Sequence, residues 1–291
     1  MTNPRMLKTL LFSMTLLASA CAADSDDTDQ ADQSAEGTRI HMLPLHSADK
    51  VANVTPAIVG LTFFGGPVLT NVEVHPVFWN SATKLQPNIN AFYSAVVGGS
   101  PLYAMLSQYT SASGVPIGSG TSVNGIIDTN STKSIRDSAI QNRLSTLIGQ
   151  GKLPAPNANT YYPVHFPSGM TITSGSSRSC VQFCAYHGTF VLNGVNVNYG
   201  VIPDIGQAGC NGGCGGSTVT NNTDSVASHE LVEATTDPAV GLATTFTFPL
   251  AWYDQIDNGE IGDLCNAQQG TSAGFTVQKE WSNAAGACVD H

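Results

Sequence analysis

The stretch HELVEA, residues 229–234, predicts a helix with an unusual polar face. At about 100° per residue, His229, Glu230 and Glu233 lie within an arc of about 100°. Asp237 extends the same face by one turn. Neighbouring carboxylates on a bare helix repel one another. A bound cation would remove this repulsion, and histidine and glutamate are ordinary zinc ligands. The stretch therefore indicates a metal site on one face of a helix.

The stretch is similar to the helical pattern His-Glu-x-x-His, in which both histidines bind zinc and the glutamate is the general base. Glu233 stands where the second histidine would be, and a carboxylate is also a zinc ligand. We therefore expect His229 and Glu233 to bind zinc and Glu230 to activate a water molecule. The alternative is a buried, hydrogen-bonded His229 beside a solvated acidic face, with no metal.

A third ligand is expected from outside the helix, and Glu260 suits that role. Asp263 would then hold the free ring nitrogen of His229, as outer carboxylates do in zinc sites. Asp237 would support the same face. Tyr253 is a candidate to stabilise an oxyanion. The order of strand, hairpin, glycine-rich loop, helix and distant acid resembles the zincin arrangement, in which an edge strand lies along the cleft above the metal-binding helix.

Two further groups are weaker candidates for the site. His187 lies in a Cys-Ala-Tyr-His-Gly sequence and could reach the cleft as a ligand or as a donor to the transition state. Its alternative is a packed or exposed loop residue. Asp254, Asp257 and Glu260 could instead hold calcium in an oxygen-rich loop, although their spacing does not match the EF-hand pattern. Calcium therefore stands beside zinc as a candidate cofactor.

Residues 1–20 predict an export signal. Arg5 and Lys8 precede an apolar run that is too short to span a bilayer as a permanent helix. The sequence Leu-Ala-Ser-Ala-Cys ending at Cys21 is typical of bacterial lipoprotein processing, which would make Cys21 the lipidated N-terminus. Ordinary signal-peptide cleavage nearby is the alternative. We expect a protein of the bacterial cell envelope, anchored to the membrane by this lipid, or an extracellular one.

Residues 21–40 are expected to form an acidic, disordered tether, because such a segment cannot bury enough apolar surface to order itself. Residues 41–291 are enough for a single domain with its own core. The chain carries a net charge of −10, and its acids outnumber its bases by 21 to 11. This excess argues against nucleic acid as a partner, because phosphate binding needs basic patches.

Six cysteines lie beyond residue 100, and an even number in an exported chain predicts three disulfides. The local spacings favour Cys180–Cys184 and Cys210–Cys214, which leaves Cys265–Cys288. A zinc site made by four cysteines is the competing interpretation. Thiols of exported proteins are normally oxidised, so we expect the disulfides.

Strands and helices interleave along the chain without a strict alternation. The patterns predict strands at 68–79 and 161–166, a hairpin at 188–203 with its turn at Asn193-Gly194, and helices at 87–97, 101–109, 134–149 and 224–236. Ser100 is the expected N-cap of the second helix. Beyond residue 237 we expect mostly irregular chain. The predicted fold is of the α/β (α+β) class, with a mixed twisted sheet, helices on it and disulfide stabilisation.

Three motifs resemble the Exordium-like (phosphate-induced) proteins. They are Phe-Cys-Ala-Tyr-His-Gly at 183–188, the Cys210-x-x-x-Cys214 pair, and Ser-His-Glu-Leu-Val-Glu at 228–233. A segment found in some members matches 260–265. The resemblance covers about residues 65–290 and implies export, disulfides and a shared domain. Plant members are secreted to the cell wall and linked to growth.

The residues thus support two functions. The first is an exported, membrane-tethered metal-binding protein that acts as a zinc-dependent, metallopeptidase-like hydrolase on a peptide. The second is a non-catalytic extracellular module of the Exordium type, which would bind a polymer at the cell surface or cell wall. The sequence leaves the substrate and the oligomeric state open.

Overall fold

The computed structural model describes Met1, Met42–Pro44 and residues 60–291 of the 291-residue chain. The chain divides into two units, Met1–Gln33 and Ser34–His291, and the second holds all the elements described below. The expected signal peptide apart from Met1, and the whole of the expected acidic tether with Cys21, lie outside the described residues. Within the described residues, no helix is both long and apolar enough to cross a membrane.

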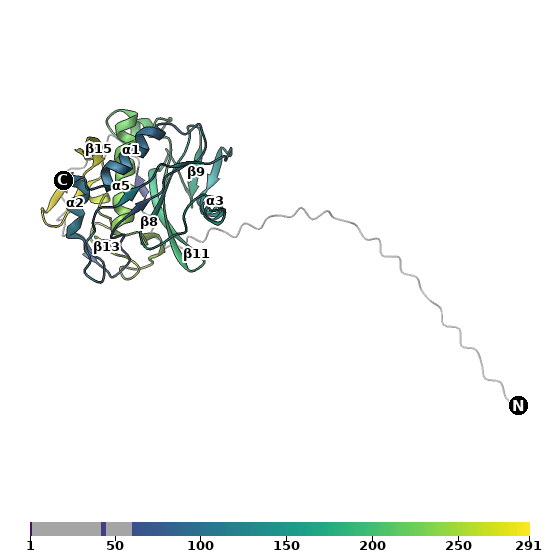
Figure 1. Ribbon diagram of the computed structural model, residues 1–291, viewed down its shortest axis with the longest axis horizontal. Coiled ribbons are helices and arrows are strands. Elements are labelled where there is room, and N and C mark those ends of the chain that lie inside the picture. Colours follow the sequence, from purple (N-terminus) through teal and green to yellow (C-terminus); the bar gives the residue numbers. More distant parts are fainter. Residues whose placement is uncertain (2–41, 45–59) are drawn as a thin grey trace. The chain divides into compact units, whose positions relative to one another are not determined.

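An eight-stranded mixed sheet forms the centre of this unit (Figure 1). Its main path runs β1-β11-β12-β8-β3-β5, and β4 joins β8 to β6. Pairing is antiparallel from β1 to β12 and parallel elsewhere. The strands are β1 (Met42–Pro44), β3 (Glu73–Val74), β4 (Val77–Phe78), β5 (Thr121–Ser122), β6 (Ile126–Ile127), β8 (Thr160–His165), β11 (Phe183–Leu192) and β12 (Val195–Ile202). The predicted mixed α/β class is confirmed.

The hairpin of β11 and β12 has the predicted turn. Asn193 and Gly194 have φ values of 51° and 82°, as a two-residue turn with both central residues left-handed requires. The turn fixes the register, so that His187 pairs with Gly200. Residues 183–189 are all buried, because this end of the hairpin is covered on both faces. The register therefore places His187 in the interior.

The predicted strand at 68–79 is broken into β3 and β4. Pro76 lies between them and has no N–H to donate to the sheet, which explains the break. The predicted helix at 134–149 begins as a strand, β7 (Ser134–Arg136), and becomes helical only as α3 (Asp137–Gly149). β7 pairs with β9 (Thr171–Ser174), which also pairs with β10 (Ser177–Arg178).

The first predicted helices are confirmed as α1 (Gln86–Val97) and α2 (Pro101–Met105), with a 3-10 turn, η1 (Leu106–Gln108), after α2. Ser100 caps α2, since its Oγ accepts a hydrogen bond of 3.2 Å from the backbone N–H of Tyr103. Apolar faces of α1 and α2 pack with Leu231 and Val232 in one core cluster. A second cluster joins α3 to the sheet through Ile140 and Leu144.

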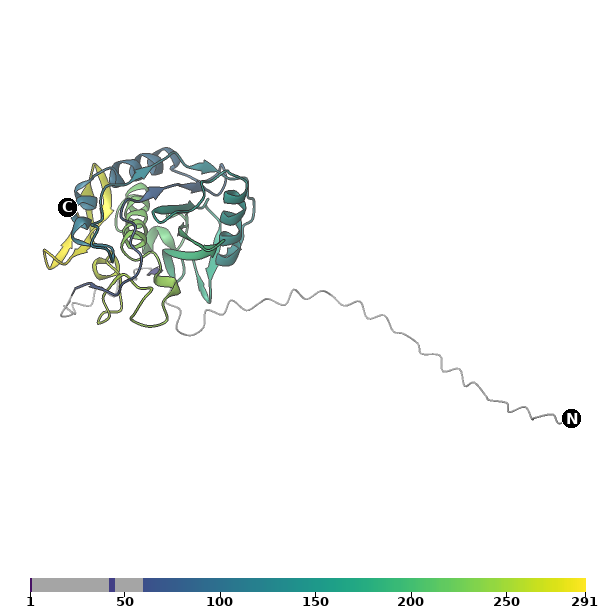
Figure 2. The same cartoon turned by 60° about the horizontal axis from the view of Figure 1, so that its bottom comes forward.

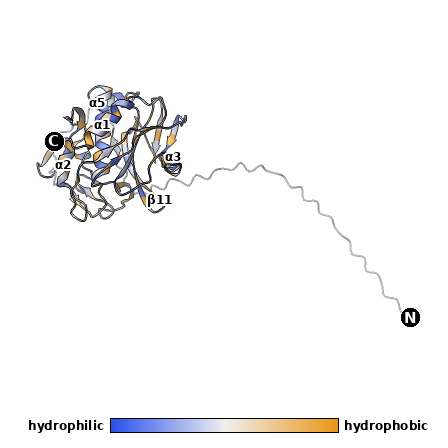
Figure 3. Ribbon diagram, in the orientation of Figure 1, coloured by the Kyte–Doolittle hydropathy of each residue, from blue (hydrophilic) through white to orange (hydrophobic). Residues whose placement is uncertain are grey.

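The long helix α5 (Val219–Thr236) lies inside the unit (Figure 2). It begins at Thr218, whose Oγ1 accepts a hydrogen bond from Asn221 N, and it ends before Asp237-Pro238 as predicted. Every residue from Asn222 to Thr236 is buried. Figure 3 shows hydrophilic and hydrophobic residues side by side within the elements of this unit. The acidic face of α5 is therefore not solvated.

The chain beyond α5 is more regular than expected. Two hairpins, β14 (Gln269–Ser272) with β15 (Phe275–Gln278) and β16 (Glu280–Ser282) with β17 (Ala287–Val289), pack on one side of the unit. β13 (Trp252–Tyr253) pairs with β2 (Thr62–Phe63). The remaining turns are α4 (Cys210–Gly213), η2 (Val240–Leu242) and η3 (Asp263–Cys265). The short strands carry no long alternating pattern, which is why the sequence did not indicate them.

Three disulfides are present, but two of the predicted pairings are wrong. The bridges are Cys180–Cys210, Cys184–Cys214 and Cys265–Cys288. Residues four apart on a helical turn have Cβ atoms about 5–6 Å apart, whereas a disulfide needs about 3.5–4.5 Å. Cys184 lies in an extended strand, where such a neighbour is further away still. One bridge instead joins Cys180, just before β11, to Cys210 at the start of α4, and the other joins Cys184 in β11 to Cys214 just after α4. Three disulfides are typical of an oxidising, exported environment.

The ion pair between Arg143 of α3 and Asp128 yields a test of the fold. Asp128 is buried, and Arg143 Nε donates to its Oδ2 over 2.7 Å. Burial alone would raise the pKa of Asp128, but the hydrogen bonds from Arg143 lower it below the ordinary value. Because the folded pKa is lowered, the stabilisation is present at neutral pH and is lost as the pH falls through the folded pKa.

We expect Arg143→Met to lower the free energy of unfolding by about 3 kcal/mol at pH 7, because it leaves a buried carboxylate unpaired. The loss should shrink at pH 3, where Asp128 gains a proton in the variant. Urea unfolding at both pH values measures this, with the exposed Arg178→Met as the control. Equal losses at both pH values would contradict this account.

Candidate metal centre

Helix α5 and strand β11 bring one histidine and two carboxylates together. Nδ1 of His187 lies 3.4 Å from Oε2 of Glu230 and 3.6 Å from Oε2 of Glu233. All three side chains are buried, and their ligand atoms lie within 4.8 Å of one another. Atoms about 2.0–2.2 Å from a shared tetrahedral zinc would lie about 3.3–3.5 Å apart. This buried His-Glu-Glu group can therefore hold a metal ion.

The other side of the His187 ring faces Glu260 and the end of α5. Nε2 of His187 lies 3.5 Å from Oε1 of Glu260 and 3.4 Å from the backbone oxygen of Asp237. A metal-binding histidine usually directs its second N–H at a carboxylate or a backbone carbonyl. A proton on Nε2 would leave the lone pair of Nδ1 free to bind a cation.

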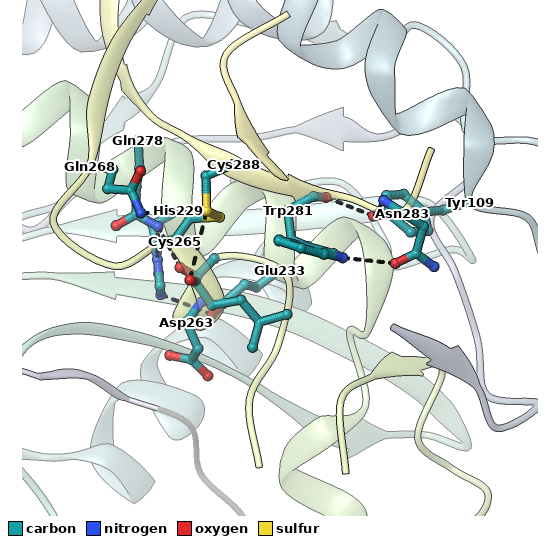
Figure 4. Close-up of a disulfide and its surroundings, with 12 residues drawn as sticks. Tyr109, His229, Glu233, Asp263, Cys265, Gln268, Gln278, Trp281, Asn283 and Cys288 are labelled. Atoms are coloured by element: carbon teal, nitrogen blue, oxygen red, sulfur yellow. Dashed lines mark hydrogen bonds and ion pairs between the residues drawn. A yellow bond between two sulfur atoms is a disulfide. The ribbon is translucent and has the colours of Figure 1, made fainter. Parts of the chain in front are cut away.

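His229 belongs to a second group, with Glu233 and Asp263, whose ligand atoms also lie within 4.8 Å of one another. Nε2 of His229 lies 3.1 Å from Oε2 of Glu233. Asp263 donates its backbone N–H to Oε1 of Glu233 over 3.1 Å. Figure 4 shows His229, Glu233 and Asp263 lying close together. Glu233 is therefore common to both groups.

The outer nitrogen of His229 contacts a glutamine that the sequence did not indicate. Nδ1 lies 2.7 Å from Nε2 of Gln278 on β15, and the same Nε2 donates to the backbone oxygen of Gly262 over 2.8 Å. The sequence predicts Asp263 at this position. Asp263 instead accepts a hydrogen bond from the backbone N–H of Glu260. Gln278 therefore orients the His229 ring, and Asp263 lies on the Glu233 side.

Many buried polar atoms of these residues have no hydrogen-bond partner. They are Nδ1 of His187, Nε2 of His229, Oε2 of Glu233, Oδ2 of Asp237 and both carboxylate oxygens of Glu230, Glu260 and Glu280. Leaving a buried polar group unpaired costs about 1–3 kcal/mol, and more when it is charged. Such a concentration in one place calls for an explanation, and a bound cation would supply a partner for those of these atoms that belong to the two groups of ligand atoms within 4.8 Å of one another.

The shifted pKa values also indicate more carboxyl groups in this interior than the two histidines can neutralise. Burial raises the pKa of Glu230, Glu260 and Glu280, and it raises that of Asp237 to about 8. Burial alone would lower the pKa of His229, but the neighbouring Glu233 raises it to about 10. Without a cation, several of these acids would have to carry protons at neutral pH. A divalent cation would neutralise them instead.

The remaining predicted residues lie in different settings. Tyr253 lies in an apolar cluster with Val240 and Leu250, and its ring packs against Phe246 at a centroid distance of 5.9 Å. Asp237 is the C-cap residue of α5, and its Oδ1 accepts a hydrogen bond from Ala251 N.

The three acids of the predicted calcium loop do not converge. Asp254 is buried, and its Oδ1 accepts hydrogen bonds from the backbone N–H groups of Ile256 and Asp257. Asp257 is exposed, whereas Glu260 is buried against His187. Among the described residues, these three acids form no group close enough to share an ion.

A surface groove of about 880 Å³ lies beside the C-terminal end of α5. Leu69, Asn198, Pro238, Ala239 and Phe248 are among its lining residues. None of the histidines or carboxylates of the two groups lines it. The candidate metal centre and this groove are therefore separate, although Pro238 directly follows Asp237.

Comparison of the chain with protein-family models, with curated proteins and with solved structures finds no match.

Gly262 allows the close approach of η3 to the site. A Cβ atom at this position would lie 2.5 Å from Nδ1 of His229 and 2.9 Å from Oε1 of Glu233. We expect Gly262→Ala to lower the free energy of unfolding by about 1–3 kcal/mol, as other overpacked interiors do. Metal affinity should fall as well. Gly149→Ala in α3 is the matched control, since its Cβ would have no neighbour within 4 Å. Equal stability of the two variants would contradict this role for Gly262.

Proposed function

We propose that this chain is an exported metalloprotein in which His187, Glu230 and Glu233 bind one divalent cation. Glu260 would support the centre from the opposite side of the His187 ring, where its oxygen lies 3.5 Å from Nε2. The observation that carries the proposal is the concentration of buried ligand atoms without partners, contributed by a strand and a helix far apart in the sequence.

Zinc is the cation that we propose. One imidazole nitrogen and two carboxylates form a donor set that zinc accepts in tetrahedral sites. Calcium takes six to eight oxygen ligands at longer distances, and imidazole is not among its usual ligands. The alternative calcium loop has no supporting geometry, because its acids lie apart. We therefore propose zinc rather than calcium for this centre.

The burial of the centre supports a structural role for the metal. Glu230 and Glu260 are 0% exposed and His187 is 1% exposed. Structural zinc sites are closed, whereas catalytic ones keep a position open to substrate. The protein would then be a non-catalytic extracellular module that binds a cell-surface polymer, as the resemblance to Exordium-like proteins implies. Lipid attachment at Cys21 belongs to the same proposal and would tether the module to the membrane.

A zincin-like hydrolase is the second candidate, and one observation favours it. Both carboxylate oxygens of Glu230 lack a hydrogen-bond partner, and burial raises its pKa, as a general base requires. In this case His229 and Glu233 would bind the zinc, with Glu230 beside it to activate water for attack on a peptide. The distinction between the candidates is whether Glu230 is a ligand or a base.

Metal removal tests the proposed centre. Protein with intact disulfides is dialysed against a chelator and then titrated with zinc while its melting temperature is measured. At a free zinc concentration of about 100 times Kd, the cation should stabilise the fold by about 2.7 kcal/mol. That corresponds to a rise in Tm of about 5–10 °C for a unit of this size.

His187→Gln should abolish this rise in Tm. His75→Gln is the matched control, because His75 lies in the sheet and packs against Tyr162, outside the cluster. An unchanged response to zinc in His187→Gln would exclude His187 as a ligand.

Glu230→Gln separates the two functions. If Glu230 is a ligand, the variant should lose more zinc affinity than the roughly 10–100-fold that outer contacts contribute. If Glu230 is a general base, the variant should retain zinc and lose hydrolysis of a peptide library that the wild-type protein cleaves. Isothermal titration calorimetry and mass spectrometry of the library measure both. Full zinc affinity in Glu230→Gln would contradict the proposed role of Glu230 as a ligand.

A further inference from the structure

Glu233 lies between the two histidines. Its Oε2 is 3.1 Å from Nε2 of His229 and 3.6 Å from Nδ1 of His187. Its Oε1 is held by the backbone N–H of Asp263, so that the carboxylate cannot turn away without losing this bond. Each histidine has its own additional carboxylate, Glu230 beside His187 and Asp263 beside His229. The arrangement therefore contains two triads that share one residue.

We propose that the centre is dinuclear, with a second divalent cation bound by His229, Glu233 and Asp263. Glu233 would bridge the two cations. This inference rests on the proposed function, which supplies the first cation at His187, Glu230 and Glu233. Carboxylate bridges are suited to the role, because each glutamate offers two oxygens and about four lone pairs.

The number of acids supports a second cation. Six carboxylates gather around the two histidines, those of Glu230, Glu233, Asp237, Glu260, Asp263 and Glu280. One divalent cation balances two of them. Buried charges without a counter-charge are costly, so a second cation would neutralise two more.

A buried imidazole nitrogen points to a ligand at the second position. Nε2 of His229 faces Oε2 of Glu233 over 3.1 Å without a hydrogen bond of good geometry, although the side chain is 0% exposed. Glu280 is also 0% exposed, neither of its oxygens has a partner, and its carboxylate interacts electrostatically with His229. Asp263 is the one ligand that retains some exposure, so a cation would enter from its side.

Gln278 makes the two cation positions unequal in affinity. A cation on Nε2 of His229 requires the ring proton on Nδ1, which then needs an acceptor. Nε2 of Gln278 occupies that position and also donates to Gly262. The amide must therefore turn to present its oxygen, and it loses the bond to Gly262. The first position needs no such change, so the second cation should bind more weakly.

Zinc stoichiometry tests the inference on the full exported chain with its disulfides intact. Elemental analysis and calorimetric titration should give two equivalents for the wild-type protein, in a tight step and a weaker one. His229→Gln and Asp263→Asn should each lose the weaker step and retain the tight one. His187→Gln should lose the tight step, and His75→Gln should bind two equivalents. Asp263 is the least buried of the ligands, so Asp263→Asn is the variant least expected to disturb the fold.

Manganese supplies a second readout. Two Mn²⁺ ions bridged by Glu233 should give an exchange-coupled electron paramagnetic resonance signal, which Asp263→Asn should replace with that of an isolated ion. A single zinc equivalent in the wild-type protein would overturn the dinuclear centre and leave the proposed function standing. No binding at all would overturn both. Two equivalents in His229→Gln and Asp263→Asn would place the second cation elsewhere and also overturn the inference.

Discussion

Burial of the Glu233 carboxylate between two imidazoles is the constraint on which the rest of the unit depends. One imidazole comes from the same helix, and the other comes from β11, more than forty residues earlier. This contact requires α5 and β11 to lie face to face, and it removes several carboxylates from water. The helix is accordingly enclosed by β11, β12 and β15, and its acids are retained inside the protein. A charged group is kept in such a place only when it is paired or coordinated.

The sequence indicated the local structure where a residue type has a strict conformational role. Asn193-Gly194 marked the hairpin turn, Ser100 marked the start of α2, and Asp237-Pro238 marked the end of α5. The sequence-based predictions failed where contacts between elements determine the secondary structure. Residues 134–136 have a helical pattern but pair with β9 as a strand, and the predicted strand at 68–79 is divided into β3 and β4 at Pro76.

The site was predictable only along the helix. His229, Glu230 and Glu233 are related by helical spacing, so their common face follows from the sequence. Gln278 follows no motif and reaches the site because the β14–β15 hairpin folds against α5. Glu280 follows no motif either, and it begins the next strand, β16, from which its charge acts on His229. His187 was recognised as a candidate, but its proximity to Glu230 depends on the register of β11. The disulfide pairing was likewise not predictable, because it depends on which elements are neighbours in the fold.

The two disulfides that join residues 180 and 184 to residues 210 and 214 also hold the candidate site together. Cys184 precedes His187 on β11 by three residues, and its bridge to Cys214 ties that strand to the segment just before α5. The two elements that meet at Glu233 are thus linked covalently as well as by packing. Oxidation of these cysteines restricts the relative positions of His187 and Glu230 whether or not an ion is bound. The two sides of the candidate metal centre are therefore held near one another by a covalent bond that a reduced chain would lack.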